Sequence, residues 1–208
     1  MKLLKQYGLI LAVIVLFMAA KSVNKNYKLA LKFYYKGEYS TALSKVDLAI
    51  AQGKTTESMW LKGYILAAME NHKRAVFFLG YKLKPGNEPD GNLIALGDSY
   101  YELGNYEMAK NCYQKAKELD MRGFNNLGTT YYRLNENDSA IYYWTRVIEM
   151  DSTKAFAYFG RGIAHDEEMR MGCACRDYQK ACELGVANAC EALEKQNCLS
   201  WKHEWGCK

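Results

Sequence analysis

The chain has few of the residues that usually build an active site. Its 208 residues include only three histidines, which lie far apart in the sequence at positions 72, 165 and 203. It has no glycine-rich phosphate loop, no nucleophile elbow and no metalloprotease helix motif. We therefore expect a protein that is not an enzyme and that holds no cofactor. The two prolines in the whole chain also leave helices largely uninterrupted.

No pair of the seven cysteines has the Cys-x-x-Cys spacing. This absence argues against a thiol-redox enzyme, which needs a reactive thiol beside a resolving cysteine. It also weakens the case for a metal site. Cys173, Cys175, His203 and Cys207 could in principle supply ligands for Zn²⁺ or Cu(I), but we expect no metal. A cell-wall or thiol-redox enzyme remains the less favoured alternative.

Charge of one sign is also scarce. The formal net charge is +5, and without Lys2, Lys5 and Lys21 the remaining 25 basic residues face 23 acidic ones, a net charge of +2. This excess is too small to predict nucleic-acid binding. Most lysines and arginines are therefore expected on solvated faces.

The N-terminal segment has the pattern of a secretory signal. Lys2 and Lys5 precede an uncharged run from Gln6 to Ala20, and small residues follow. We expect residues 1–22 to be removed by cleavage before Val23, since a run of 15 residues is short for a bilayer span of about 20. The alternative is an uncleaved inner-membrane anchor, with residues 6–20 as the tether. Both interpretations place the body of the protein outside the cytoplasm, in the periplasm, in the medium or on the inner membrane.

Small residues recur at a nearly constant interval. Five alanines are separated by 33, 34, 31 and 34 residues, and a second small residue lies twelve positions before each. The alanines are Ala42, Ala75, Ala109, Ala140 and Ala174, and their partners are Ala30, Gly63, Gly97, Gly128 and Gly162. A period near 34 with two small positions predicts stacked pairs of helices in an all-α chain.

The clearest repeat shows which family this pattern resembles. Leu96-Gly97 and Tyr100 lie on the first helix, Gly104 marks the turn, and Ala109 lies on the returning helix. The pattern resembles the tetratricopeptide repeat, which implies a right-handed α-α superhelix. The second repeat departs from it most, because Glu70 and His72 replace the turn glycine and the tyrosine. The predicted repeats cover residues 23–55, 56–89, 90–120, 121–154 and 155–186, followed by a cap over 187–208.

The resemblance also implies a binding surface. In this family the first helices line a concave groove that holds an extended peptide or a single helix, so we expect a protein or peptide partner. Transferred by phase, the predicted groove residues are Tyr27, Tyr34, Trp60, Tyr64, Asp98, Tyr101, Asn125, Tyr132 and Arg133. Asn125 and Arg133 could bind a carboxylate or a peptide backbone. For the aromatic residues, packing between neighbouring repeats remains an equal alternative.

Six cysteines lie within the last 36 residues. The segment around Cys182 and Cys190 resembles the cysteine-rich Sel1-like repeats of secreted bacterial proteins, which implies a disulfide between these two residues. We expect a second disulfide between Cys198 and Cys207, with Trp201 and Trp205 as lid residues, while the partners of Cys173 and Cys175 stay open. Cys112 is expected to be a buried, inert thiol.

The function that the sequence predicts is that of an exported, non-catalytic scaffold for protein–protein interaction. The alternative is a membrane-anchored structural module that takes part in assembling an envelope complex.

Overall fold

A computed structural model describes residues 25–53, 55–83, 90–116 and 120–198. The signal-like segment, the loop at 84–89 and the tail from residue 199 onwards lie outside the described residues. Within the described ranges the chain is helical and contains no strand, so the predicted all-α repeat fold is confirmed. No helix in this part of the chain has the length and apolar character needed to cross a bilayer.

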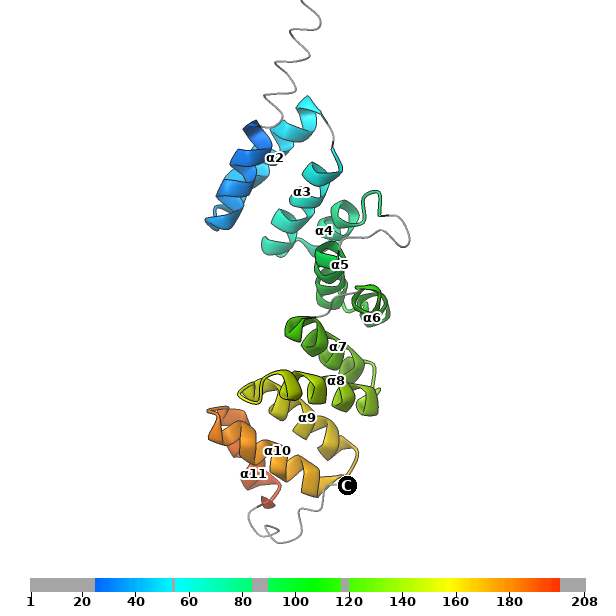
Figure 1. The fold of residues 1–208 in the computed structure, drawn as a ribbon, viewed down its shortest axis with the longest axis vertical. Coiled ribbons are helices and arrows are strands. Elements are labelled where there is room, and N and C mark those ends of the chain that lie inside the picture. Colours follow the sequence, from blue (N-terminus) through cyan, green and yellow to red (C-terminus); the bar gives the residue numbers. More distant parts are fainter. Residues whose placement is uncertain (1–24, 54, 84–89, 117–119, 199–208) are drawn as a thin grey trace, which may run out of the picture. The chain divides into compact units, whose positions relative to one another are not determined.

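The helices fall into two compact units with a boundary between Leu103 and Gly104 (Figure 1). In the N-terminal unit, residues 25–35 form the first helix. It is followed by α2 (Tyr39–Gln52), α3 (Thr56–Ala68), α4 (His72–Leu79) and α5 (Asp90–Glu102). The C-terminal unit contains α6 (Tyr106–Lys115), α7 (Met121–Arg133), α8 (Asn137–Met150), α9 (Ala155–Glu167), α10 (Met171–Glu183) and α11 (Ala187–Lys195).

Within each unit, consecutive helices pack against each other. In addition, α3 contacts α5 and α7 contacts α9, so the first helices of successive repeats lie side by side. This is the arrangement of stacked helical hairpins, in which each pair covers the apolar face of its neighbour.

The small residues of the repeat lie where helices approach most closely. All five periodic alanines are completely buried. At Gly63, an added Cβ would lie 2.7 Å from the Leu79 side chain and 2.9 Å from the Leu79 backbone nitrogen. Because backbone cannot move aside cheaply, only glycine allows α3 and α4 this contact.

The tight turn within the hairpins has one recurrent backbone conformation. Gly37 and Gly104 adopt positive φ angles of 77° and 73°, and Glu70, Asn135 and Met169 adopt the same left-handed region at 59°, 59° and 56°. At the α9–α10 turn, the amide of Arg170 donates to the carbonyl of His165, and the amide of Met169 donates to that of Asp166. These bonds satisfy carbonyls at the helix end and force the left-handed residue between the helices.

A glycine at position 169 should stabilise the protein. Met169 is 88% exposed, so its side chain contributes little packing, while its left-handed conformation costs about 1 kcal/mol for a residue with a Cβ. We expect Met169→Gly to raise the free energy of unfolding by about 0.5 kcal/mol, because the greater freedom of glycine in the unfolded chain offsets part of the gain. Urea denaturation followed by circular dichroism measures this change, and a loss of stability would contradict it.

Candidate functional site

The predicted groove residues of the N-terminal unit are partly used in packing. Tyr27 and Tyr34 lie half-buried against the core that contains Ala30, Val46 and Ile65. Trp60 is also half-buried, and its indole N–H donates to the carbonyl oxygen of Tyr81 at 2.9 Å. These contacts give the three aromatic rings defined positions before any partner is present.

Tyr64 links the first helices of two successive repeats. Its hydroxyl donates to the Asn92 side-chain oxygen at 2.6 Å, across the contact between α3 and α5. Burial raises the pKa of Tyr64 to about 12, so the hydroxyl stays protonated and remains a donor. Asp98 and Tyr101 lie further along α5 and are partly exposed. These two are the predicted groove residues that α5 contributes.

In the C-terminal unit, Tyr132 forms the corresponding link between first helices. Its hydroxyl on α7 donates to a carboxylate oxygen of Glu167 on α9 at 2.6 Å. This hydrogen bond to the carboxylate is the main reason that the pKa of Tyr132 rises to about 12. The ring also lies 6.1 Å from that of Trp144, centroid to centroid. The aromatic side chain is therefore held in place from two sides.

Asn125 and Arg133 have different surroundings on α7. The side-chain oxygen of Asn125 accepts a hydrogen bond from the indole of Trp144 at 3.2 Å, which leaves its amide group as the donor that a peptide could use. Arg133 is exposed, and its guanidinium carbon lies 5.6 Å from the ring centroid of Tyr106. This cation–π contact orients the guanidinium without burying it.

A buried ion pair in the C-terminal unit was not predicted from the sequence. Arg161 on α9 donates through two nitrogens to both carboxylate oxygens of Asp177 on α10, each at 2.7 Å, and a third nitrogen donates to the Thr145 hydroxyl on α8 at 3.0 Å. Asp177 is only 3% exposed. The signal that could have revealed it is an acidic residue three positions after Ala174, on the face of α10 that packs inwards.

The segment His165-Asp166-Glu167-Glu168 has a partly structural role. His165 is buried, and this burial lowers the pKa of its imidazole and favours the neutral form. Asp166 accepts hydrogen bonds from Tyr178 at 3.2 Å and from Gln196 at 2.7 Å, while Glu167 and Glu168 are exposed. His165 therefore packs inwards, Asp166 holds α10 and the end of α11 in place, and only Glu167 and Glu168 face solvent.

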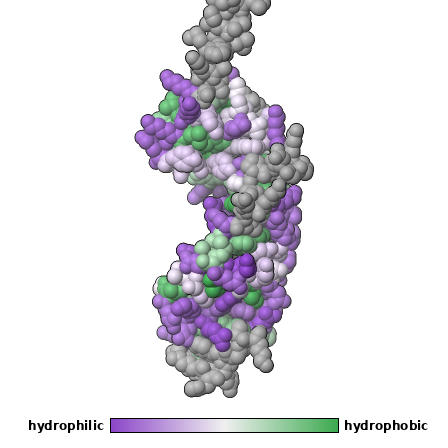
Figure 2. Space-filling model, in the orientation of Figure 1, coloured by the Kyte–Doolittle hydropathy of each residue, from purple (hydrophilic) through white to green (hydrophobic). Residues whose placement is uncertain are grey.

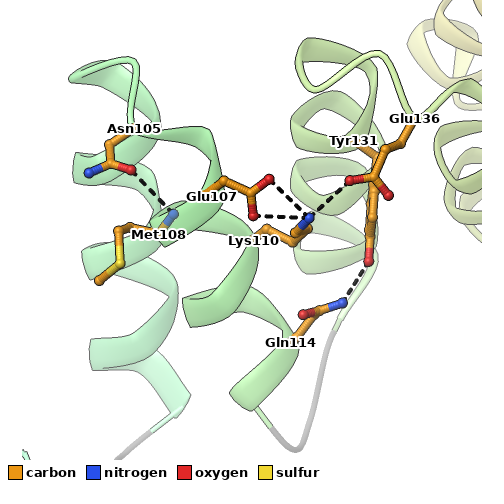
Figure 3. A network of polar contacts seen from close by, with 7 residues as sticks. All are labelled: Asn105, Glu107, Met108, Lys110, Gln114, Tyr131 and Glu136. Carbon is orange, nitrogen blue, oxygen red and sulfur yellow. Dashed lines mark hydrogen bonds and ion pairs between the residues drawn. The ribbon is translucent and has the colours of Figure 1, made fainter.

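A polar network joins α6 to the end of α7 and the following turn (Figure 3). The Lys110 ammonium lies 2.9 Å from a carboxylate oxygen of Glu136 and 3.1 Å from one of Glu107. Gln114 donates to the Tyr131 hydroxyl at 2.6 Å. The hydrogen bonds to Glu136 and Glu107 raise the pKa of Lys110, which keeps it charged at neutral pH. The network fixes the register of these two helices.

Within the described residues, two disulfides join α10 to the segment that follows it. Cys182 is bonded to Cys190, as predicted, with a Cα–Cα distance of 4.9 Å. Cys198 is bonded to Cys175, so the predicted pairing of Cys198 with Cys207 was wrong. Cys175 and Cys182 lie seven residues apart, which places both on one face of α10 opposite α11.

Cys173 and Cys112 are not reactive thiols either. Cys173 is also in a disulfide, and Cys112 is a buried free thiol whose pKa burial raises to about 11. Such a thiol is not a nucleophile at neutral pH. Oxidation of Cys173 and Cys175 removes the thiolates that the metal alternative required. The two disulfides formed between described residues indicate an oxidising, extracytoplasmic environment.

Comparison with known proteins gives matches in both sequence and structure. A sequence model of the tetratricopeptide repeat matches residues 92–122. Ethylene-overproduction protein 1 of Arabidopsis thaliana is 27% identical over 150 residues, which are 68% of this chain and 16% of that protein. Protein bimA of Emericella nidulans is 26% identical over 98 residues, 46% of this chain and 12% of that protein. The chain thus spans less than a fifth of the length of these curated relatives.

Solved structures resemble the chain over most of its length. The crystal structure of YrrB, described as a tetratricopeptide repeat protein with an unusual peptide-binding site, matches with a TM-score of 0.74 at 20% identity. The match covers 85% of this chain and 97% of YrrB. MamA from Desulfovibrio magneticus matches with a TM-score of 0.72 at 18% identity, over 78% of this chain and 94% of that chain. At these identities the likeness establishes the fold.

Proposed function

Because the chain has the fold of tetratricopeptide repeat proteins, we propose that it is an exported, non-catalytic scaffold that binds an extended peptide or a single helix along its first helices. The fold supports a protein–protein interaction scaffold in general. Export agrees with the secretory pattern of residues 1–22 and with the disulfides of α10.

The observation that carries the proposal is the linkage of neighbouring first helices by tyrosine side chains. Tyr64 bonds to Asn92 and Tyr132 bonds to Glu167, and both tyrosines are only half-buried. An aromatic ring that is already fixed loses little conformational entropy when a partner packs on it. Tyrosine and arginine are also the residue types that contribute most at protein interfaces. The peptide-binding site described for YrrB supports the same kind of ligand here.

Peptides selected from a display library against the full chain provide the probe for this proposal. We expect Tyr101→Ala and Arg133→Ala each to weaken the affinity for the best peptide by about tenfold, because both residues lie partly or fully exposed on first helices. Isothermal titration calorimetry measures the affinity. Neither variant should reduce the helical circular dichroism signal by more than a small fraction.

The matched control is Tyr142→Ala, which removes a 58% exposed tyrosine from α8, a second helix. It should leave the affinity unchanged. An equal loss in the control, or a library that gives no binder, would reject the groove as the binding surface.

A membrane-anchored assembly module is the second candidate, supported by the uncharged run from Gln6 to Ala20. The N-terminal residue of the protein recovered from cells separates the two candidates. A chain that begins near Val23 supports the exported scaffold, whereas an intact Met1 in the membrane fraction supports the anchored module.

A further inference from the structure

The first described helix has one strongly basic face. Lys25, Lys28, Lys32 and Lys36 are all exposed, and they are spaced by three, four and four residues. At 3.6 residues per turn, this spacing places them within an arc of about 80° along about 16 Å of helix and the turn that follows. The four positive charges therefore form a single stripe.

This stripe contains no acidic residue in its own segment of the sequence. Residues 25–37 contain four lysines and no acidic residue. Among the ion pairs of the described residues, none involves these four lysines, whereas Lys62 pairs with Asp47 and Lys110 with Glu107 and Glu136. Figure 1 draws residues 25–35 and α2 in blue, on the left of the N-terminal unit. In Figure 2 this side of the unit is mostly hydrophilic.

The rest of the helix is occupied by packing and leaves the basic face outward. Ala30 is completely buried, and Tyr27, Leu31, Phe33 and Tyr34 pack against the core of the N-terminal unit. Beside the stripe, Tyr35 is 81% exposed. Tyrosine next to lysine is the combination that occurs at the boundary between lipid headgroups and water.

We propose that this lysine face binds the surface of an anionic phospholipid bilayer. A straight row of charges on one helix fits a flat, negatively charged surface, and each lysine near such a surface raises partitioning by about fivefold. In the sequence, four residues separate Lys25 from the uncharged run that ends at Ala20, and Lys21 lies between them. The proposal shares only the extracytoplasmic location with the proposed function and does not depend on the peptide groove.

The direct test is lysine footprinting on the full chain. The protein is acetylated alone, with phosphatidylcholine vesicles, and with vesicles that also contain phosphatidylglycerol, and the modified lysines are quantified by mass spectrometry. We expect the acetylation rates of Lys28, Lys32 and Lys36 to fall at least fivefold, and only on the phosphatidylglycerol vesicles. Lys73 and Lys195, which are exposed on α4 and α11, should react at an unchanged rate.

A matched pair of triple variants tests the same face by co-sedimentation. Lys28→Gln/Lys32→Gln/Lys36→Gln should reduce the additional binding caused by phosphatidylglycerol by about a hundredfold. The control, Lys73→Gln/Lys115→Gln/Lys195→Gln, removes the same charge from exposed positions elsewhere and should retain that binding.

Three results would overturn the proposal. The first is equal protection on both kinds of vesicle, which would show that charge is not used. The second is equal loss of binding in both triple variants, which would assign the effect to net charge. The third is protection of the same lysines by double-stranded DNA at the same salt concentration, which would assign the face to polyanions in general. Each of these leaves the outcome of the peptide experiment unaffected.

Discussion

Asp177→Ala is expected to lower the free energy of unfolding by about 3 kcal/mol or more, because it leaves the Arg161 guanidinium largely buried and without its counter-ion. The Asp177 side chain is 4% exposed and that of Arg161 is 19% exposed, so water can solvate the remaining charge only in part. The hydrogen bond from Arg161 to Thr145 cannot replace a carboxylate. Urea denaturation followed by circular dichroism measures the loss.

Two comparisons show whether burial is the cause. Asp138→Ala breaks the pair with Arg170, in which the Asp138 side chain is 77% exposed, and should cost less than about 1 kcal/mol. Arg161→Met/Asp177→Leu replaces both charges by apolar side chains and should recover most of the stability lost in Asp177→Ala. If Asp177→Ala were no less stable than Asp138→Ala, burial of the ion pair would not be the cause of the loss.

Removing the disulfide between Cys175 and Cys198 has the second large effect. Its cysteines are 23 residues apart, and closing a loop of this length restricts the unfolded chain by about 3 kcal/mol. Both cysteines are also almost fully buried, within the cluster that contains Ala174, Tyr178 and Leu193. We expect Cys175→Ala/Cys198→Ala to lower the free energy of unfolding by at least this amount, measured by urea denaturation under non-reducing conditions.

The disulfide between Cys182 and Cys190 provides the internal comparison. It closes a loop with a separation of only eight residues, and both cysteines are partly exposed. Cys182→Ala/Cys190→Ala should therefore cost less, about 2.5 kcal/mol. The reverse order of the two losses would show that packing around α11 does not depend on the buried disulfide.

The repeat pattern predicted those features that depend on local periodicity. Ala42 and its four equivalents are buried because a small residue at a fixed phase marks the contact between two helices of one hairpin. The turn at Glu70 adopts the left-handed conformation found at Gly37, although its side chain gave no sign of it. The hairpin geometry imposes the turn whichever residue occupies it, so phase was a better guide than residue type.

Pairings between side chains on different helices were less predictable. Cys198 was expected to pair with the nearest later cysteine, but it bonds to Cys175 because α11 runs antiparallel to α10 and brings its end back beside that residue. For Asp177, the only sign in the sequence of its buried ion pair was its position three residues after Ala174, on the inward face of α10. The sequence left open whether Trp60 and Tyr64 are groove residues or packing residues. Both are half-buried, and each donates one hydrogen bond, Trp60 to Tyr81 and Tyr64 to Asn92, so each is held in place and still partly exposed.

The sequence by itself determined the all-helical repeat and the close-packed alanine positions, because both depend on spacing within one or two neighbouring helices. The disulfide between Cys182 and Cys190 was implied by the resemblance of its segment to Sel1-like repeats. Only the tertiary structure decided the partner of Cys198, the burial of the Arg161–Asp177 pair and, within the described residues, the absence of ion pairs on the lysine face. These features depend on which surfaces of separate helices meet, and that is set by the packing of whole hairpins rather than by any local pattern.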